Sequence, residues 1–224
     1  MRRTRAKQGE LPYRNWGGPR KGAGRKPKGD RPMVSHDRRA ALASRNPVHV
    51  TCKLRRGLPT LRRKAEYRVL RGAFAKGCER FGFRLVHYSV QGDHLHLIAE
   101  AKDREALSRG MQGLLIRVAK ALNKLWSRKG SVFGDHYHDR ILRTPREVRN
   151  ALAYVMHNAR RHGRRIEKGL DYFCSGWWFD GWREELTIRG LDGVERPVAH
   201  ARTWLLDKGW RKHRLLSLGE VPGG

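Results

Sequence analysis

The sequence predicts an α+β fold in which helices cover an antiparallel sheet. Short segments in which apolar and polar residues alternate, as at 48–52, 83–90 and 94–100, are typical of strands. Longer segments between them carry apolar residues at three- and four-residue steps, as helices do. A tight turn is expected at Gln91-Gly92-Asp93, which would join two strands as a hairpin.

The first half of the chain predicts two strand and helix pairs. Val48 to Cys52 is short, β-branched and alternating, which indicates a strand. A helix is expected from about Thr60, closed by Gly82, because apolar residues recur at helical spacing: Tyr67, Leu70, Phe74, Cys78 and Phe81. After the hairpin, Asp103 can cap a second helix that stops near Gly130.

The next segment, 131–143, contains another extended stretch, so the order of elements is β-α-β-β-α-β. That order is the ferredoxin-like arrangement. A third helix should begin at Thr144-Pro145-Arg146-Glu147, which combines an N-cap hydroxyl, a proline at the first helical position and a capping-box glutamate. Its spacing predicts a buried stripe from Val148 to Ala159, with Tyr154 and Asn158 one above the other on a flank outside it.

Charge and cysteine content limit the class of protein. Fifty Lys and Arg against 21 Asp and Glu give a net charge of +29, which favours a polyanionic partner, with nucleic acid first. We expect no membrane partner and a cytoplasmic, nucleoid-associated protein, because the N-terminus has no apolar segment and no run of about 18 apolar residues occurs. Three distant cysteines without a CxxC motif indicate reduced thiols.

Composition divides the chain into three parts. Residues 1–45 are rich in Arg, Lys, Gly and Pro and predict a flexible basic arm. Within it, Arg25, Lys26 and Lys28 resemble an AT-hook for the minor groove, although a basic tail that binds any phosphate backbone explains them as well. Residues 46–163 form the predicted main domain. Residues 164–224 form a Trp-rich extension that could stack unpaired bases or pack onto the domain.

Two histidines two residues apart are the candidate metal ligands. On a strand, His94 and His96 point to the same face, with backbones roughly 6.5–7 Å apart, so that both rings can reach one divalent ion. Two partly exposed histidines on a half-buried strand are the alternative. A second pair, His136 and His138, has a polar centre on both sides and is the weaker candidate, suited to DNA contact or to support of a ligand.

Three motifs resemble those of the single-tyrosine HUH transposases, and most closely the REP-associated tyrosine transposases. They are Asp93-His94-Leu95-His96-Leu97, Val132-Phe133 with Asp139-Arg140-Ile141-Leu142, and Ala153-Tyr154-Val155-Met156-His157-Asn158. The resemblance covers about residues 46–163. It implies a metal-dependent enzyme that cuts and rejoins single-stranded DNA at hairpin-associated sites through a 5′-phosphotyrosine. The alternatives are a DNA- or RNA-binding protein without strand transfer and a replication or conjugation nickase.

The resemblance also assigns roles to residues. Tyr154 is the expected nucleophile, and His94, His96 and Asn158 are the expected ligands of Mg²⁺ or Mn²⁺. Insertion-sequence relatives commonly have Gln where this chain has the shorter Asn158. Arg160 and Arg161 are further predicted DNA contacts. The expected partners are single-stranded and hairpin DNA, and a homodimer is compatible with the pattern.

Overall fold

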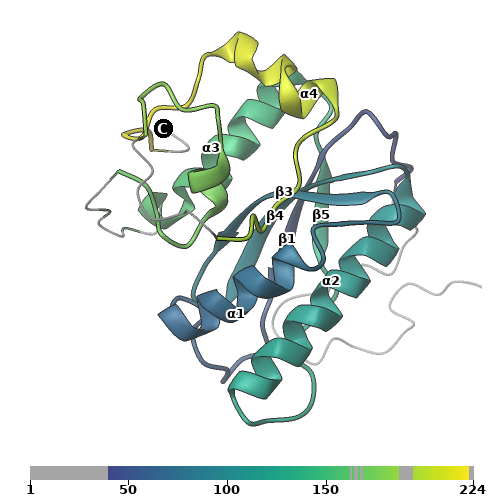
Figure 1. Cartoon of the computed structure of the whole chain (residues 1–224). Helices are drawn as coiled ribbons and strands as arrows, with labels where there is room; N and C mark the ends of the chain where they lie inside the picture. The colour runs from purple at the N-terminus through teal and green to yellow at the C-terminus, as the bar shows by residue number, and fades with distance from the viewer. Residues whose placement is uncertain (1–39, 162, 164–165, 167–168, 187–193, 222–224) are drawn as a thin grey trace, which may run out of the picture. The chain divides into compact units, whose positions relative to one another are not determined.

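The computed structural model describes residues 40–161, 163, 166, 169–186 and 194–221. In them, five strands form one antiparallel sheet in the order β2-β3-β4-β1-β5 (Figure 1). The strands are β1 (Val48–Lys53), β2 (Glu79–Arg80), β3 (Phe83–Val90), β4 (His94–Ala101) and β5 (His138–Ile141). Apart from the short β2, the strand order is that of a ferredoxin-like sheet, so the predicted fold class is confirmed.

The helices lie on both faces of this sheet. They are α1 (Lys64–Ala75), α2 (Arg104–Leu125), α3 (Pro145–Arg161) and α4 (Trp204–Asp207), with short 3₁₀ turns η1 (Ser175–Trp178) and η2 (Gly209–His213). Figure 1 shows α1 and α2 on one face and α3 on the other. Leu95 and Leu97 of β4 belong to the core under α1 and α2, whereas Ile98 belongs to the core under α3. Both faces are therefore buried.

The predicted end of the first helix is wrong. α1 stops at Ala75, and the chain then forms a second hairpin in which Arg80 pairs with Phe83 across a two-residue turn. Phe81 and Gly82 in that turn have φ of 52° and 78°, as a tight hairpin turn with two left-handed residues requires. Phe81 is consequently 83% exposed rather than part of the core. Helical spacing continued by chance into a segment whose hydrogen bonds go to a strand.

The predicted starts of α2 and α3 are confirmed by their capping hydrogen bonds. Asp103 accepts a hydrogen bond from the Ala106 amide at 2.7 Å, which fixes the start of α2. At α3, the Thr144 hydroxyl accepts from the Glu147 amide at 3.2 Å, and the Glu147 carboxylate accepts from the Thr144 amide at 3.1 Å. This reciprocal pair is the capping box. The amides of Arg143 and then Thr144 also hold the pKa of Glu147 below its usual value.

The C-terminal segment is attached to the domain by buried polar contacts. Glu100, which is fully buried in β4, accepts from the Arg84 guanidinium at 2.8 Å and from the Thr203 amide and hydroxyl at 2.8 and 2.7 Å. Arg62 donates twice to Asp171, at 2.8 and 2.7 Å. Trp182 and Trp210 are buried in the core under α3. Much of this Trp-rich segment therefore packs against α3, although Trp204 remains 53% exposed.

Exchange of Glu100 for glutamine tests the contacts made by this buried carboxylate. We expect Glu100→Gln to lower the free energy of unfolding by about 3 kcal/mol, because the partly buried Arg84 keeps its charge without a carboxylate partner. Urea unfolding at neutral pH measures it. Glu105→Gln, which removes the exposed helical ion pair with Arg109, is the control and should have little effect. A loss no larger than the control's would contradict the assignment.

Candidate active site

The two histidines of β4 lie together on the sheet face that α3 covers. Their ring centroids are 4.8 Å apart, with the rings nearly perpendicular. Alternation along the strand places both on this face, while Leu95 between them is fully buried on the other. The predicted HxH geometry is therefore present.

α3 brings the predicted tyrosine to this pair. The ring of Tyr154 contacts His96 edge to face, with centroids 5.0 Å apart. The capping box fixes where α3 begins, and the fully buried stripe Val148, Leu152 and Val155 sets the face that it turns to the sheet. Tyr154, half-buried at the side of that stripe, is thereby placed over the β4 histidines.

A third imidazole, which the sequence analysis did not single out, completes the cluster. His49 of β1 stacks on His96 at 5.4 Å and contacts Tyr154 edge to face at 5.6 Å. Burial, and then the nearby Arg140 guanidinium, lowers the pKa of His49 to about 4, so the ring is neutral at pH 7. The signal was present in Val48-His49-Val50, where alternation sends His49 to the face opposite the two valines.

Neighbouring oxygens orient both β4 imidazoles. The Thr51 hydroxyl lies 3.2 Å from His96 Nδ1, across the β1–β4 ladder. The Asp93 carboxylate lies 2.7 Å from His94 Nδ1, and this hydrogen bond is the main reason that the pKa of Asp93 is lowered. Histidine ligands in metal sites commonly bind the ion through one nitrogen while the other donates to such an oxygen. Held in this way, both rings would ligate through Nε2.

Asn158 lies one helical turn after Tyr154 and is fully buried, contrary to its predicted place on a flank outside the core. The α3 helix is covered on more sides than its stripe predicts, because the C-terminal segment packs against it. Within the described residues, neither amide atom of Asn158 has a hydrogen-bond partner. A buried amide in this state is rare in folded proteins and marks a group suited to an additional ligand.

The two histidines of the second pair lie in different local structure, one before β5 and one at its first position. His138 opens β5 opposite Thr51, on the same sheet face as His96, and is exposed. Asp139 points to the other face, where Arg104 of α2 donates to it at 2.6 Å. His136 precedes the strand and is exposed. Across the described ranges, no group of three or more His, Cys, Asp or Glu side chains is arranged to hold a metal ion, so a third ligand at His94 and His96 would be of another type.

The predicted DNA contacts are placed only in part. Arg25, Lys26 and Lys28 lie outside the described residues, as does the side chain of Arg161, the last residue of α3. Arg160 donates to the Gly169 carbonyl at 3.0 Å and so helps to hold the chain that follows α3. In the part of the chain that the structure describes, no helix is long and apolar enough to cross a bilayer.

Comparison with known proteins finds a match over the part of the chain that carries this cluster. A family model described as "Transposase IS200 like" matches residues 47–158, half of the 224-residue chain, and these bounds contain the β4 histidines, Tyr154 and Asn158. The solved structure of a REP-associated tyrosine transposase bound to a REP hairpin is similar in fold, with a TM-score of 0.51 and 19% sequence identity. That similarity covers 63% of this chain and 82% of the solved one. No curated protein matches.

Replacing the buried amide tests whether it lowers the stability of the fold. We expect Asn158→Leu to raise the free energy of unfolding of metal-free protein by about 1–3 kcal/mol, because a buried amide without partners is replaced by an apolar group of similar size. Asn123→Leu is the control and should destabilise, since Asn123 bonds to Gly130 and Arg128. Thermal unfolding in a chelator measures both. Destabilisation by Asn158→Leu would show that the amide has a structural role.

Proposed function

This chain belongs to the IS200-like transposase family, and on that basis we propose that it is a metal-dependent transesterase that cuts and rejoins single-stranded DNA through Tyr154. The observation that carries the proposal is the contact between the Tyr154 ring and His96, at 5.0 Å, on a sheet face where His94 also lies. A phenol beside two imidazoles of one chain combines a nucleophile with candidate metal ligands.

The strand-transfer step follows from the chemistry of the phenol. The Tyr154 oxygen attacks phosphorus, the bond from phosphorus to the 3′ oxygen breaks, and the phenolic proton is lost while the 3′ oxygen gains one. The products are a 5′-phosphotyrosine and a free 3′-OH. Because phenolate is a good leaving group, a 3′-OH can later attack the phosphotyrosine and reseal the strand. Bond energy is kept throughout, so no nucleotide cofactor is needed.

His94, His96 and the Asn158 carbonyl are the proposed ligands of Mg²⁺ or Mn²⁺. The buried Asn158 amide without partners and the oxygens that orient the two imidazoles support this set. A bound ion would act as a Lewis acid on the non-bridging phosphate oxygens. His49, which is neutral at pH 7, packs against Tyr154 at the site without adding positive charge.

The proposed substrate is single-stranded DNA next to a hairpin. Support comes from the net charge of +29, which suits a phosphate backbone, and from the similar fold of the solved transposase, which is bound to a REP hairpin. Such a substrate would place the protein at the nucleoid. Because Tyr154 meets His96 of its own chain, a single subunit would contain both nucleophile and ligands.

Removal of the phenol oxygen tests the nucleophile. Tyr154→Phe should abolish the covalent adduct with a labelled single-stranded hairpin oligonucleotide and leave binding nearly unchanged, because only the attacking atom is lost. Adducts are measured on a denaturing gel and binding by fluorescence anisotropy. Tyr172→Phe, at a half-exposed tyrosine outside the site, is the matched control and should form adduct normally. Adduct formation by the Tyr154 variant rules out the assignment, and a chain that binds DNA but never forms adduct is a binding protein instead.

Titration calorimetry with Mn²⁺ tests the ligands. His94→Ala or His96→Ala should abolish cleavage and weaken Mn²⁺ binding by at least about tenfold, whereas His136→Ala and His138→Ala should retain it. Asn158→Ala should have a milder effect, because a water can replace one oxygen ligand. The reverse ranking of the two histidine pairs would move the metal site to the second pair.

A further inference from the structure

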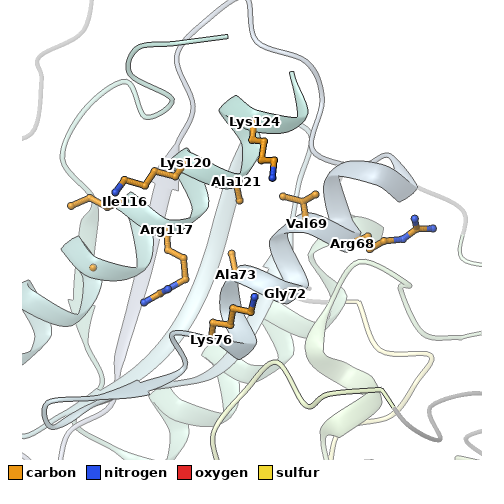
Figure 2. Close-up of a pocket in the computed structure, with 11 residues that line it drawn as sticks. Arg68, Val69, Gly72, Ala73, Lys76, Ile116, Arg117, Lys120, Ala121 and Lys124 are labelled. Atoms are coloured by element: carbon orange, nitrogen blue, oxygen red, sulfur yellow. The ribbon is translucent and has the colours of Figure 1, made fainter. Parts of the chain in front are cut away.

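A basic groove lies between α1 and α2, on the sheet face opposite the Tyr154 site. Its volume is about 620 Å³, and its lining comes from α1, from Lys76 directly after α1, and from α2. Figure 2 shows side chains from both helices along it, with basic groups around a floor that includes Val69, Ala73 and Ala121. We call this hollow the α1–α2 groove.

The charge of this groove has one sign. Its lining contains no acidic residue. Five cationic side chains line it: Arg68, Lys76, Arg117, Lys120 and Lys124. No carboxylate among the described residues forms an ion pair with any of them. The Nε atom of Arg117 is buried and has no hydrogen-bond partner among the described residues. A second hollow of about 510 Å³ shares Lys120 and Lys124 and adds Arg128 and Lys129, so the basic surface continues past the C-terminal end of α2.

Two glycines keep the groove open. Gly72 in α1 and Gly113 in α2 both line it, and a Cβ added at either would meet no atom within 4 Å. Glycine is less favourable than alanine inside a helix, so neither position is explained by helix stability or by close packing. Both helices thus carry a residue of low helix propensity at the same basic groove, and such departures from local preference are typical of functional surfaces.

We propose that the α1–α2 groove binds the phosphate backbone of double-stranded DNA, the hairpin stem of the substrate. The inference rests on the proposed function, because it assigns the duplex and the reacting single strand to opposite faces of the sheet. Charge complementarity selects a polyanion. The floor residues are small, and Ile116, 48% exposed, is the one large exposed apolar side chain in the lining, which gives an acidic amphipathic helix little to anchor.

Two triple variants of the full chain separate the groove from net charge. Lys76, Lys120 and Lys124 are changed to Gln in one, and the exposed Arg80, Lys64 and Lys102 in the other, so each variant loses three positive charges. Anisotropy with a labelled 20-bp blunt duplex, titrated with KCl, measures binding. We expect the groove variant to bind about tenfold or more weakly and to flatten the salt slope by about 0.9 for each lost phosphate contact. The control should lose far less.

Equal losses in the two triple variants, or unchanged duplex binding by the groove variant, overturn the proposal and leave the groove to another partner. Gly72→Leu with Gly113→Leu is a second test that changes no charge. It should fill the groove and weaken duplex binding about tenfold while the melting temperature is kept; normal duplex binding by this folded variant also overturns the proposal.

The proposed function is tested separately with a short single strand that has no hairpin. Adduct formation on this substrate should persist in both groove variants, because Tyr154 lies on the other face of the sheet. Loss of duplex binding with adduct formation retained supports the groove as a separate DNA contact. Loss of adduct formation in the folded glycine variant would overturn that separation. Absence of adduct in the unmodified protein on the single-stranded hairpin oligonucleotide as well would overturn the proposed function and leave the duplex result to stand alone.

Discussion

The alternation of side chains along β4 is the constraint on which the rest of the structure depends. Leu95 and Leu97 enter the core under α1 and α2, and every second residue, from His94 to Glu100, faces α3. A slip of one residue would exchange the two sets and bury imidazoles among leucines. Pairing with β1 fixes the register, because Thr51 stands opposite His96 and supplies the oxygen at its ring. One ladder thus specifies the core and orients the site.

The other half of the site depends on how α3 is held. Its inner stripe packs on the sheet, and the C-terminal segment packs around it through Trp182 and Trp210. Polar contacts attach that segment to the rest of the chain: Arg62 pairs with Asp171, Arg149 of α3 pairs with Glu220, and Glu100 of β4 accepts from the Thr203 amide and hydroxyl. Partly buried ion pairs between segments that are distant in sequence are sensitive to geometry and so favour one arrangement of the C-terminal segment. Tyr154 is positioned over His96 by residues as far away in sequence as Glu220.

The site and the groove have different physical character, in line with different parts of a DNA substrate. Around Tyr154 the polar groups are buried or half-buried, and His49 is held neutral at pH 7. A bond-making step benefits from fixed groups shielded from water. The α1–α2 groove is open and lined by long cationic side chains, which suits a backbone that is bound without regard to sequence. The proposed strand transfer at a hairpin would use both kinds of surface.

The sequence by itself determined the features that depend on neighbours in the chain. The capping box at Thr144, the cap at Asp103, the pleat of β4 and the stripe of α3 are local patterns, and each appears where its residues predict it. Local hydrogen bonds and side-chain periodicity need no distant partner, so they can be read directly from the residues.

Only the tertiary structure decided which side chains meet. Phe81 continued the helical spacing but lies in a turn, because Arg80 pairs with Phe83. His49 entered the site through the pairing of β1 with β4, and Asn158 is fully buried although its helical position predicts a flank outside the core. The α1–α2 groove exists because two helices far apart in the chain lie side by side (Figure 1). Burial and contact are properties of the assembled layers, and no period within one segment contains them.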